Sequence, residues 1–418
     1  MDISFHYFAV KTLALEAGFS DPDAQIIAQY SQYIDDYNPT FPRRYSNVPD
    51  WIKNKEGSDI YISSPLNPMN FRPVTTGFMI PVDIPDMLTK EFQKNVISPF
   101  HFIPLKAGDH RTYPAKATDG GDGSLISRLL LSAKTDYGRD AVIGGDKCRQ
   151  ALMHLGMLLH TFADTYAHQM FSGYNEQCNN MKIVGLWDHT EQNLLPGLDD
   201  YISRLLKIYE DAEGEFSDKM FEIGHMLVGH VPDWTHVTLE IAFFDKEGEI
   251  ERRYKRSNPE LFSQAAMEIF DFLCECRMAA DPNVQLPRTY RGAAGADDAA
   301  RQALQDKFVT AFETSDISKV EDKPLECMAR LVQTWGGVFP SYHYSYDCSA
   351  IFDGIVGAPK SAVRKSDGGL PENGIFENEI SENRMLKGVF PEMSEDFYLF
   401  NSYAEDLLIA LYGSHPRE

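Results

Sequence analysis

The amino-acid sequence predicts a mostly α-helical fold, and three features of the 418-residue chain support this prediction. Apolar residues recur at helical spacing through most of the chain, serine and aspartate stand where helices are expected to begin, and glycine stands where one is expected to end. The predicted helices are residues 5–18, 20–38, 124–136, 146–172, 198–213, 216–230, 257–280, 298–314, 322–336 and 396–412.

The first two helices are delimited by residues typical of helix ends. The segment 5–18 ends at Gly18, a candidate C-cap, because glycine adopts the left-handed conformation there without steric cost. The segment 20–38 opens with Ser20 as a candidate N-cap and Asp23 three residues later, which is the spacing of a capping motif. Both boundaries therefore follow from local chemistry.

Residues 38–123 are rich in proline, glycine and asparagine and predict a long irregular connection, with short strands near "TTGFMIPVDI" at 75–84. Connections of this length in a compact domain usually wrap a site or carry function. A second break, "AADPNVQLPRTYRGAAGADD", separates two parts of the chain. We therefore predict a helical domain at 1–280, with the irregular insertion 38–123, and a helical and loop-rich accessory region at 281–418.

Charge, apolar runs and the N-terminal sequence argue against three classes of protein: those that coat nucleic acids, those that span membranes and those with a signal peptide. The formal net charge of −23 argues against a surface that coats a nucleic acid through general basic contacts. No apolar stretch approaches the roughly 20 residues that span a bilayer, so no transmembrane segment is expected. The N-terminus carries no recognisable signal peptide, which predicts a protein made in the cytoplasm. We expect reduced thiols at all six cysteines, which are Cys148, Cys178, Cys274, Cys276, Cys327 and Cys348.

The stretch "HLGMLLHTFADTYAHQMF", residues 154–171, combines an apolar helical pattern with three ionisable side chains. His160, Asp164 and His168 stand at positions i, i+4 and i+8, which lie on one face of a helix and drift by only about 40° per step. Burying these groups without partners would cost several kcal/mol. They are therefore either metal ligands or members of a buried polar network with Asp35 or Asp36 and tyrosines.

Further histidines and aspartates could join this face as metal ligands. Histidine and carboxylate together suit zinc or a similar ion, and two or three such ions can activate water for phosphoryl displacement. Each candidate also has an ordinary interpretation, such as a hydrogen-bonded histidine, an exposed acidic pair at a helix end or a histidine in an aromatic cluster. The additional candidates are His6, Asp35, Asp36, His101, His225, His230 and Asp233.

The order and spacing of these residues resemble the zinc-dependent phospholipase C and single-strand nuclease superfamily. The resemblance covers roughly residues 1–245 and includes a bacterial branch with no assigned activity that begins with a similar "D-I-x-F-H-Y". It implies a phospholipase C/nuclease-like helical bundle with long loops and a trinuclear zinc site. Two departures stand out: three residues instead of five separate Asp164 from His168, and the chain begins Met1-Asp2 where the superfamily has a processed N-terminal tryptophan that binds a metal.

The resemblance also implies how the ligands are shared. Asp35 or Asp36, His101, His160 and Asp164 would hold one ion, and Asp164 would bridge to a second ion that also takes His6. The third ion would take His168, one of His225 or His230, and Asp233. Asp2 could supply the oxygen that the missing tryptophan provides. The ions would activate water for attack on phosphorus, and an aspartate, Asp35 or Asp164, would accept its proton.

The expected function is a metal-dependent phosphoester hydrolase with phospholipase C-like activity. The substrate would be a phospholipid head group or a nucleotide, with transient contact to a membrane surface in the first case. The alternatives are a nuclease or phosphodiesterase acting on nucleic acid, and a non-catalytic, metal-stabilised interaction protein or leaderless secreted toxin. The acidic surface favours the phospholipase, because it offers no evident track for a nucleic-acid backbone.

Overall fold

A computed structural model describes most of the chain, and all structural statements below concern that part. The described residues are 1–38, 44–63, 69–78, 83–105, 109–213, 222–318, 324–346 and 393–413.

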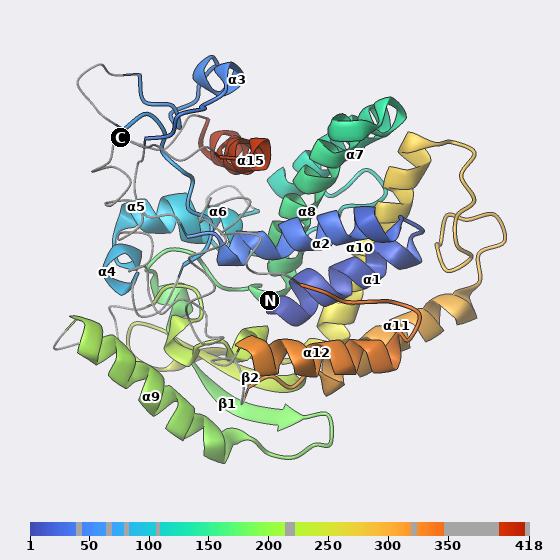
Figure 1. The fold of residues 1–418 in the computed structure, drawn as a ribbon. Helices are drawn as coiled ribbons and strands as arrows, with labels where there is room; N and C mark the ends of the chain where they lie inside the picture. The colour runs from blue at the N-terminus through green and yellow to red at the C-terminus, as the bar shows by residue number, and fades with distance from the viewer. Residues whose placement is uncertain are drawn as a thin grey trace.

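The fold is mostly helical, as predicted, with one small sheet (Figure 1). The longer helices are α1 (Val10–Glu16), α2 (Asp21–Asp36), α7 (Leu125–Ile143), α8 (Gly145–Ala167), α9 (Leu195–Glu213), α10 (Asn258–Ala280), α11 (Asp298–Thr314), α12 (Pro324–Val338) and α15 (Glu395–Tyr412). The short helical elements are η1 (Ser4–Ala9), α3 (Asp50–Lys53), α4 (Ile84–Met87), α5 (Lys90–Phe92), η2 (Gln93–Ile97), α6 (Ser98–Phe100), η3 (Gln177–Asn179), η5 (Met226–Val228) and η6 (Val231–Asp233). The strands are β1 (Met181–Asp188), β2 (Val237–Phe244) and β3 (Ile250–Ser257).

Serine N-caps start several of the helices. Ser20 accepts a hydrogen bond from the backbone N–H of Asp23 at the start of α2, as its spacing predicts. Ser124, Ser257 and Ser394 cap α7, α10 and α15 in the same way. Each cap satisfies one backbone donor that the first turn would otherwise leave free. Local sequence therefore determines where these helices begin.

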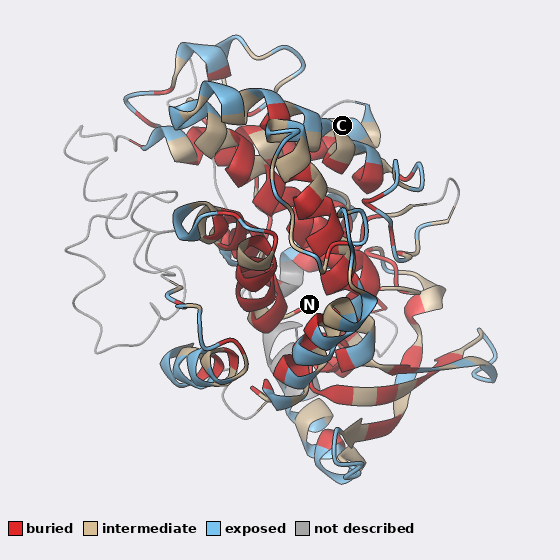
Figure 2. Ribbon diagram, turned by 90° about the vertical axis from the view of Figure 1, so that its right-hand side faces the viewer, coloured by how far each residue is buried: buried red, intermediate tan, exposed pale blue. Residues whose placement is uncertain are grey.

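Helix α8 lies in the middle of the bundle, and most of the side chains in its second half are buried. Helices α2 and α7 pack along α8, and α10 packs against both α7 and α8 (Figure 1). The buried residues form a continuous region through these central helices, while the outer faces are exposed (Figure 2). This packing places the polar face of α8 inside the molecule.

The sequence did not predict the antiparallel sheet, whose strand order is β1-β2-β3. Its inner face packs over a second apolar cluster together with α9. The helix predicted at 216–230 is wrong over its described part, because residues 222–230 form η5 and turns. Gly224 and Gly229 have positive φ angles there, which end a helix. The strands predicted at 75–84 are absent from the described part of that segment; residues 79–82 lie outside the described residues.

The C-terminal region contributes to the same core as the N-terminal helices. Phe308, Trp335 and Tyr398 belong to one buried cluster with Phe8 and Leu159. The predicted boundary after residue 280 therefore separates stretches of sequence that pack together. No described helix is both long and apolar enough to cross a bilayer. Five of the cysteines are free thiols, and Cys348 lies outside the described residues.

Gly156 allows α2 and α8 to approach closely. A Cβ atom at this position would lie 2.3 Å from the backbone oxygen of Ile27. We expect Gly156→Ala to lower the free energy of unfolding by about 1–3 kcal/mol, because a backbone atom cannot move aside as a side chain can. Urea unfolding measures this. Gly336→Ala in α12 is the control: nothing lies within 4 Å of its Cβ, so it should be neutral or stabilising. Equal effects of the two substitutions would contradict the packing argument.

His154 lies on α8 but belongs to none of the sets of metal-ligand candidates. Its surroundings predict that the free energy of unfolding depends on pH. Its ring stacks on Tyr403 with centroids 4.4 Å apart, and burial, with the charge of Lys55, lowers its pKa to about 4. In the unfolded state His154 has a pKa of about 6.5 and binds a proton as the pH falls below this value, whereas in the folded state it stays neutral down to about pH 4. The free energy of unfolding therefore decreases as the pH falls from about 6.5 to about 4. We expect wild-type protein to lose up to about 3 kcal/mol relative to His154→Phe between these pH values. An equal difference in the free energy of unfolding between wild type and His154→Phe at both pH values would contradict this prediction.

Candidate metal centre

Segments far apart in the sequence converge at the buried face of α8. Element η1 brings His6, the last turn of α2 brings Asp35, and the residue after α6 is His101. Helix α8 supplies His160 and Asp164, with His168 as its C-cap, and the turns around η5 and η6 supply His225 and Asp233. These side chains form three groups whose donor atoms are close enough to hold a metal ion: a first group of Asp35, His101 and His160, beside which Asp164 also lies; a second group of His6, His160 and Asp164; and a third group of His168, His225 and Asp233.

Four donor atoms surround one point in the first group. His101 Nδ1 and His160 Nε2 lie 3.4 Å apart, and each lies 3.3 Å from Asp164 Oδ2. Asp35 Oδ1 lies 3.7 Å from the His101 nitrogen and 3.6 Å from the His160 nitrogen. Tetrahedral coordination with bonds of about 2.0–2.2 Å separates neighbouring donors by about 3.3–3.6 Å. The spacing therefore suits a four-coordinate zinc-sized ion.

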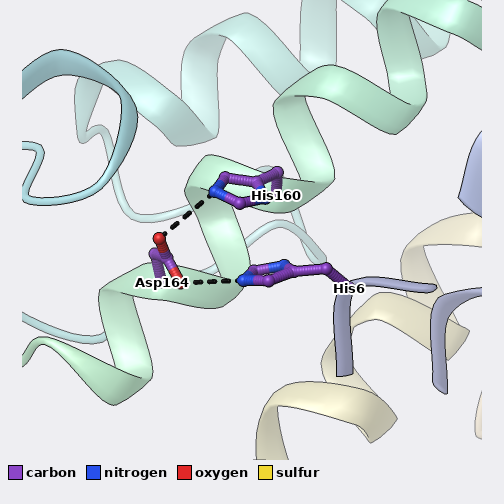
Figure 3. A group of neighbouring side chains, drawn as sticks. All are labelled: His6, His160 and Asp164. Atoms are coloured by element: carbon purple, nitrogen blue, oxygen red, sulfur yellow. Dashed lines mark hydrogen bonds and ion pairs between the residues drawn. The ribbon is translucent and has the colours of Figure 1, made fainter. Parts of the chain in front are cut away.

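The second group uses the other carboxylate oxygen of Asp164. His6 Nε2 lies 3.1 Å from Asp164 Oδ1, whereas His160 Nε2 lies 3.3 Å from the other oxygen, and the two imidazole rings stack with centroids 3.8 Å apart (Figure 3). The amino group of Met1 donates to the same oxygen over 2.5 Å and lies 3.2 Å from Asp233 Oδ1. Asp164 thus faces two groups at once, one with each oxygen, which is the arrangement of a bridging ligand.

The third group lies where α8 ends. His168 Nε2 is 3.0 Å from Asp233 Oδ1, and His225 Nε2 is 3.1 Å from Asp233 Oδ2. Phe102 stacks on the His168 ring with centroids 4.2 Å apart. His168 also stays close to the first group, since its Nδ1 lies 3.6 Å from Asp164 Oδ2 while its Nε2 faces Asp233.

Backbone carbonyls fix the orientation of three of the imidazole rings. His101 Nε2 donates to the Thr76 carbonyl over 2.8 Å, and His225 Nδ1 donates to the Gly229 carbonyl over 2.7 Å. His168 Nδ1 donates to the carbonyl of His101. Because a carbonyl only accepts, the second nitrogen of each ring is left with a lone pair directed into its group. This is the tautomer that a metal ligand needs.

The electrostatics of the cluster favour cations. Burial lowers the pKa of His6 to about 4 and lowers the pKa of His160 well below its usual value, so both rings are neutral. Burial and the charge of Asp164 hold the pKa of Asp35 well above its usual range. Burial opposes ionisation of Asp164 too, but the Met1 amino group and three histidines hold its pKa well below the usual value. A bound cation beside Asp35 would lower the pKa of this carboxyl again and favour its ionised form.

The Met1 amino group is buried in the same cluster. Burial alone would lower its pKa, but the carboxylates of Asp164, Asp233 and Asp35 raise it to about 11. Sequence reasoning did not name this amino group as a site member, although the N-terminal tryptophan that binds a metal in the resembling superfamily was a signal that the N-terminus lies at the site.

Three predicted ligands lie outside the groups. Asp36 is exposed, and its carboxylate accepts a hydrogen bond from the Tyr346 hydroxyl. His230 is 60% exposed, with its Nδ1 4.0 Å from Asp233 Oδ2. Asp2 Oδ1 accepts from the backbone N–H of Ser4, and burial raises the pKa of its carboxyl to about 7. Asp35 and His225 are thus the members of the two ambiguous pairs that the structure brings into the groups.

Comparison with known proteins gives a family without an assigned role. Residues 1–363 match the model of a family of unknown function, DUF6765. The chain belongs to this family. No curated protein and no solved structure matches the chain. The matched region contains every residue of the three groups and ends before α15, so the candidate metal centre lies wholly within the part of the chain that matches the family.

Proposed function

We propose that the chain is a metal-dependent phosphoester hydrolase that holds two or three zinc or similar divalent ions. The spacing of four donor atoms from Asp35, His101, His160 and Asp164 carries this proposal. In a buried hydrogen-bond network each acceptor meets a donor, whereas neutral His101, which donates through Nε2 to the Thr76 carbonyl, turns its Nδ1 lone pair toward the carboxylates of Asp164 and Asp35. Neutral imidazoles and carboxylates are the donor set that zinc prefers.

The third group favours an enzyme over a structural metal protein. Among the described residues it offers the side chains of His168, His225 and Asp233. Three protein ligands leave room in a four-coordinate shell for water or a substrate oxygen, as catalytic sites require. The ions, when bound, would supply Lewis acidity toward a phosphoryl oxygen and lower the pKa of a water molecule.

The chain's own residues have separable tasks in this scheme. Asp164 holds the first and second groups at a fixed separation, because its two oxygens face different donors. Asp35 is 29% exposed, more than Asp164 or Asp233, so it is the carboxylate of the three groups that is best placed to accept a proton from water. Phe102 covers one face of the His168 ring and keeps water from it.

We further propose a phospholipase C-like substrate, a phosphodiester of a lipid head group, in preference to a nucleic acid. The support is the net charge of −23, which disfavours a polyanion but is tolerated by a small phosphoester. A single-stranded nucleic acid remains the alternative substrate.

A substrate panel with zinc-loaded protein tests the function. Phosphatidylcholine vesicles, single-stranded DNA and bis(nitrophenyl) phosphate would be incubated with the protein, and product would be measured with and without a chelator. We expect cleavage of at least one phosphodiester, lost on chelation and restored by zinc. Fully loaded protein without turnover on any of them would make the chain a non-catalytic metal protein, which is the second function considered above.

A further inference from the structure

Arg256 is a buried cation on β3 that no metal ligand contacts directly. It pairs across the sheet with Leu239, so its side chain points to the inner face, and the residue is only 6% exposed. On that face lie the end of α8 and the η6 turn, which carry His168 and Asp233. The guanidinium group of Arg256 therefore contacts the backbone of the two segments that carry His168 and Asp233.

The guanidinium joins the two ligand-bearing segments through their carbonyl groups. Its Nη1 donates to Ala167 O over 2.6 Å and approaches Tyr166 O at 3.4 Å, while its Nη2 donates to Pro232 O over 2.6 Å. Ala167 immediately precedes His168, and Pro232 immediately precedes Asp233. One planar group thus holds the backbone next to both ligands, and it also satisfies carbonyls that the end of α8 leaves free.

Asn258 reinforces this connection from the first turn of α10. Its Nδ2 donates to Pro232 O over 3.1 Å and to Trp234 O over 2.7 Å, on either side of Asp233. Both Arg256 and Asn258 therefore contact the same carbonyl. The turn that presents Asp233 is held by side chains rather than by a regular helix or strand.

Burying an arginine side chain is energetically unfavourable, so the contacts that compensate for it must be explained. Desolvating a guanidinium costs several kcal/mol, and polar partners must offset this cost. Only arginine offers donors in a rigid fork that can reach two separate segments with both arms, while lysine offers a single nitrogen. The carboxylate of Asp233 is close enough to interact with its charge.

We propose that Arg256 is a positioning residue that sets the separation of His168 and Asp233 and so determines the affinity of the third group for its ion. This inference rests on the proposed function, because it assumes that the group binds metal. It goes beyond that function by assigning control of one ion to a residue outside the ligand set. Loss of the fork lets the end of α8 and the η6 turn separate, while the first group, held by α2 and α8, is unaffected.

Zinc binding by full-length variants tests the inference. Apo protein would be titrated with zinc, and the number of ions and their dissociation constants measured. We expect Arg256→Met to weaken one ion by about 10–100-fold and leave the others unchanged, as for other residues that orient metal ligands. Arg256→Lys, which keeps the charge but not the fork, should give an intermediate loss. Arg253→Met on the exposed face of β3 is the matched control and should bind zinc like wild type.

A second substitution identifies which ion is affected. His225→Ala removes a ligand of the third group, so adding Arg256→Met to it should cause no further loss, whereas the same change in a His101→Ala background should add its full effect. Should Arg256→Met fail to fold, the lysine variant carries the same comparison. Lowered melting temperature with unchanged zinc affinity in the lysine variant, or equal weakening of every ion, would overturn the inference. Wild-type protein that binds no zinc would overturn the proposed function itself.

Discussion

Asp164→Asn is expected to remove the zinc of two groups and to retain that of the third. Asp164 Oδ2 faces His101 and His160, while Oδ1 faces His6, so each carboxylate oxygen serves a different group. An asparagine amide has one oxygen and one NH₂ group, and the NH₂ cannot act as a ligand. The substitution preserves shape, so loss of metal would follow from chemistry rather than from a cavity.

The expected result is a fall in bound zinc to about one ion per chain, measured by elemental analysis after dialysis. Hydrolysis of the best substrate should fall at least about 100-fold in kcat/KM, comparable with the loss of one preorganised electrostatic contact. Asp146→Asn, in the exposed first turn of the same helix, is the matched control and should keep full zinc content. Full zinc content in Asp164→Asn would exclude Asp164 as a bridging ligand.

The helices could be predicted from the sequence because their signals are local. The apolar spacing and serine caps of α2 and α10 depend on residues within a few positions of one another. The sheet could not be assembled in this way, since β1 pairs with β2 across a long intervening segment that includes α9. One signal was nevertheless present: the alternating burial of β2 follows the alternation of "VTLEI", which indicates a half-buried strand.

The same distinction applies to the site. The i, i+4, i+8 spacing placed His160 and Asp164 correctly side by side, because helix geometry alone fixes their relation. It also placed His168 on that face, and His168 Nδ1 does lie 3.6 Å from Asp164 Oδ2, but the spacing did not predict that α8 ends at Ala167 or that His168 Nε2 faces Asp233. Spacing in the sequence cannot say where a helix stops when the last turn is apolar.

The tertiary structure was needed to decide which aspartate of Asp35 and Asp36, and which histidine of His225 and His230, lies in the groups. Asp35 and Asp36 are neighbours on α2, so they point in directions about 100° apart, and only the rotation of α2 against α8 decides which one enters. Asp35 faces His160, whereas Asp36 meets Tyr346 from a distant part of the chain. His225 enters and His230 does not, because the short 3-10 turn η5 and Gly229, with its positive φ angle, separate them instead of a regular α-helix.

Zinc is expected to raise the melting temperature of the metal-free protein by about 5 °C or more. Without cations, the carboxylates of Asp164 and Asp233 share a single amino group, and burial together with the charge of Asp164 raises the pKa of Asp35 well above its usual range. A ligand present at 100 times its dissociation constant stabilises the folded state by about 2.7 kcal/mol per site. Three occupied groups would therefore add a substantial fraction of a typical folding free energy.

Asp35→Asn and Asp36→Asn provide a matched pair for this measurement. The two carboxylates are adjacent on α2, but only Asp35 lies within reach of His101 and His160. Zinc should therefore stabilise Asp36→Asn as much as wild type and stabilise Asp35→Asn less, because the first group loses a charged ligand. The measurement is differential scanning calorimetry of apo protein with and without added zinc. An equal rise in both variants would remove Asp35 from the ligand set, and no rise in wild type would mean that the convergence of histidine and aspartate on α8 is a hydrogen-bonded network instead.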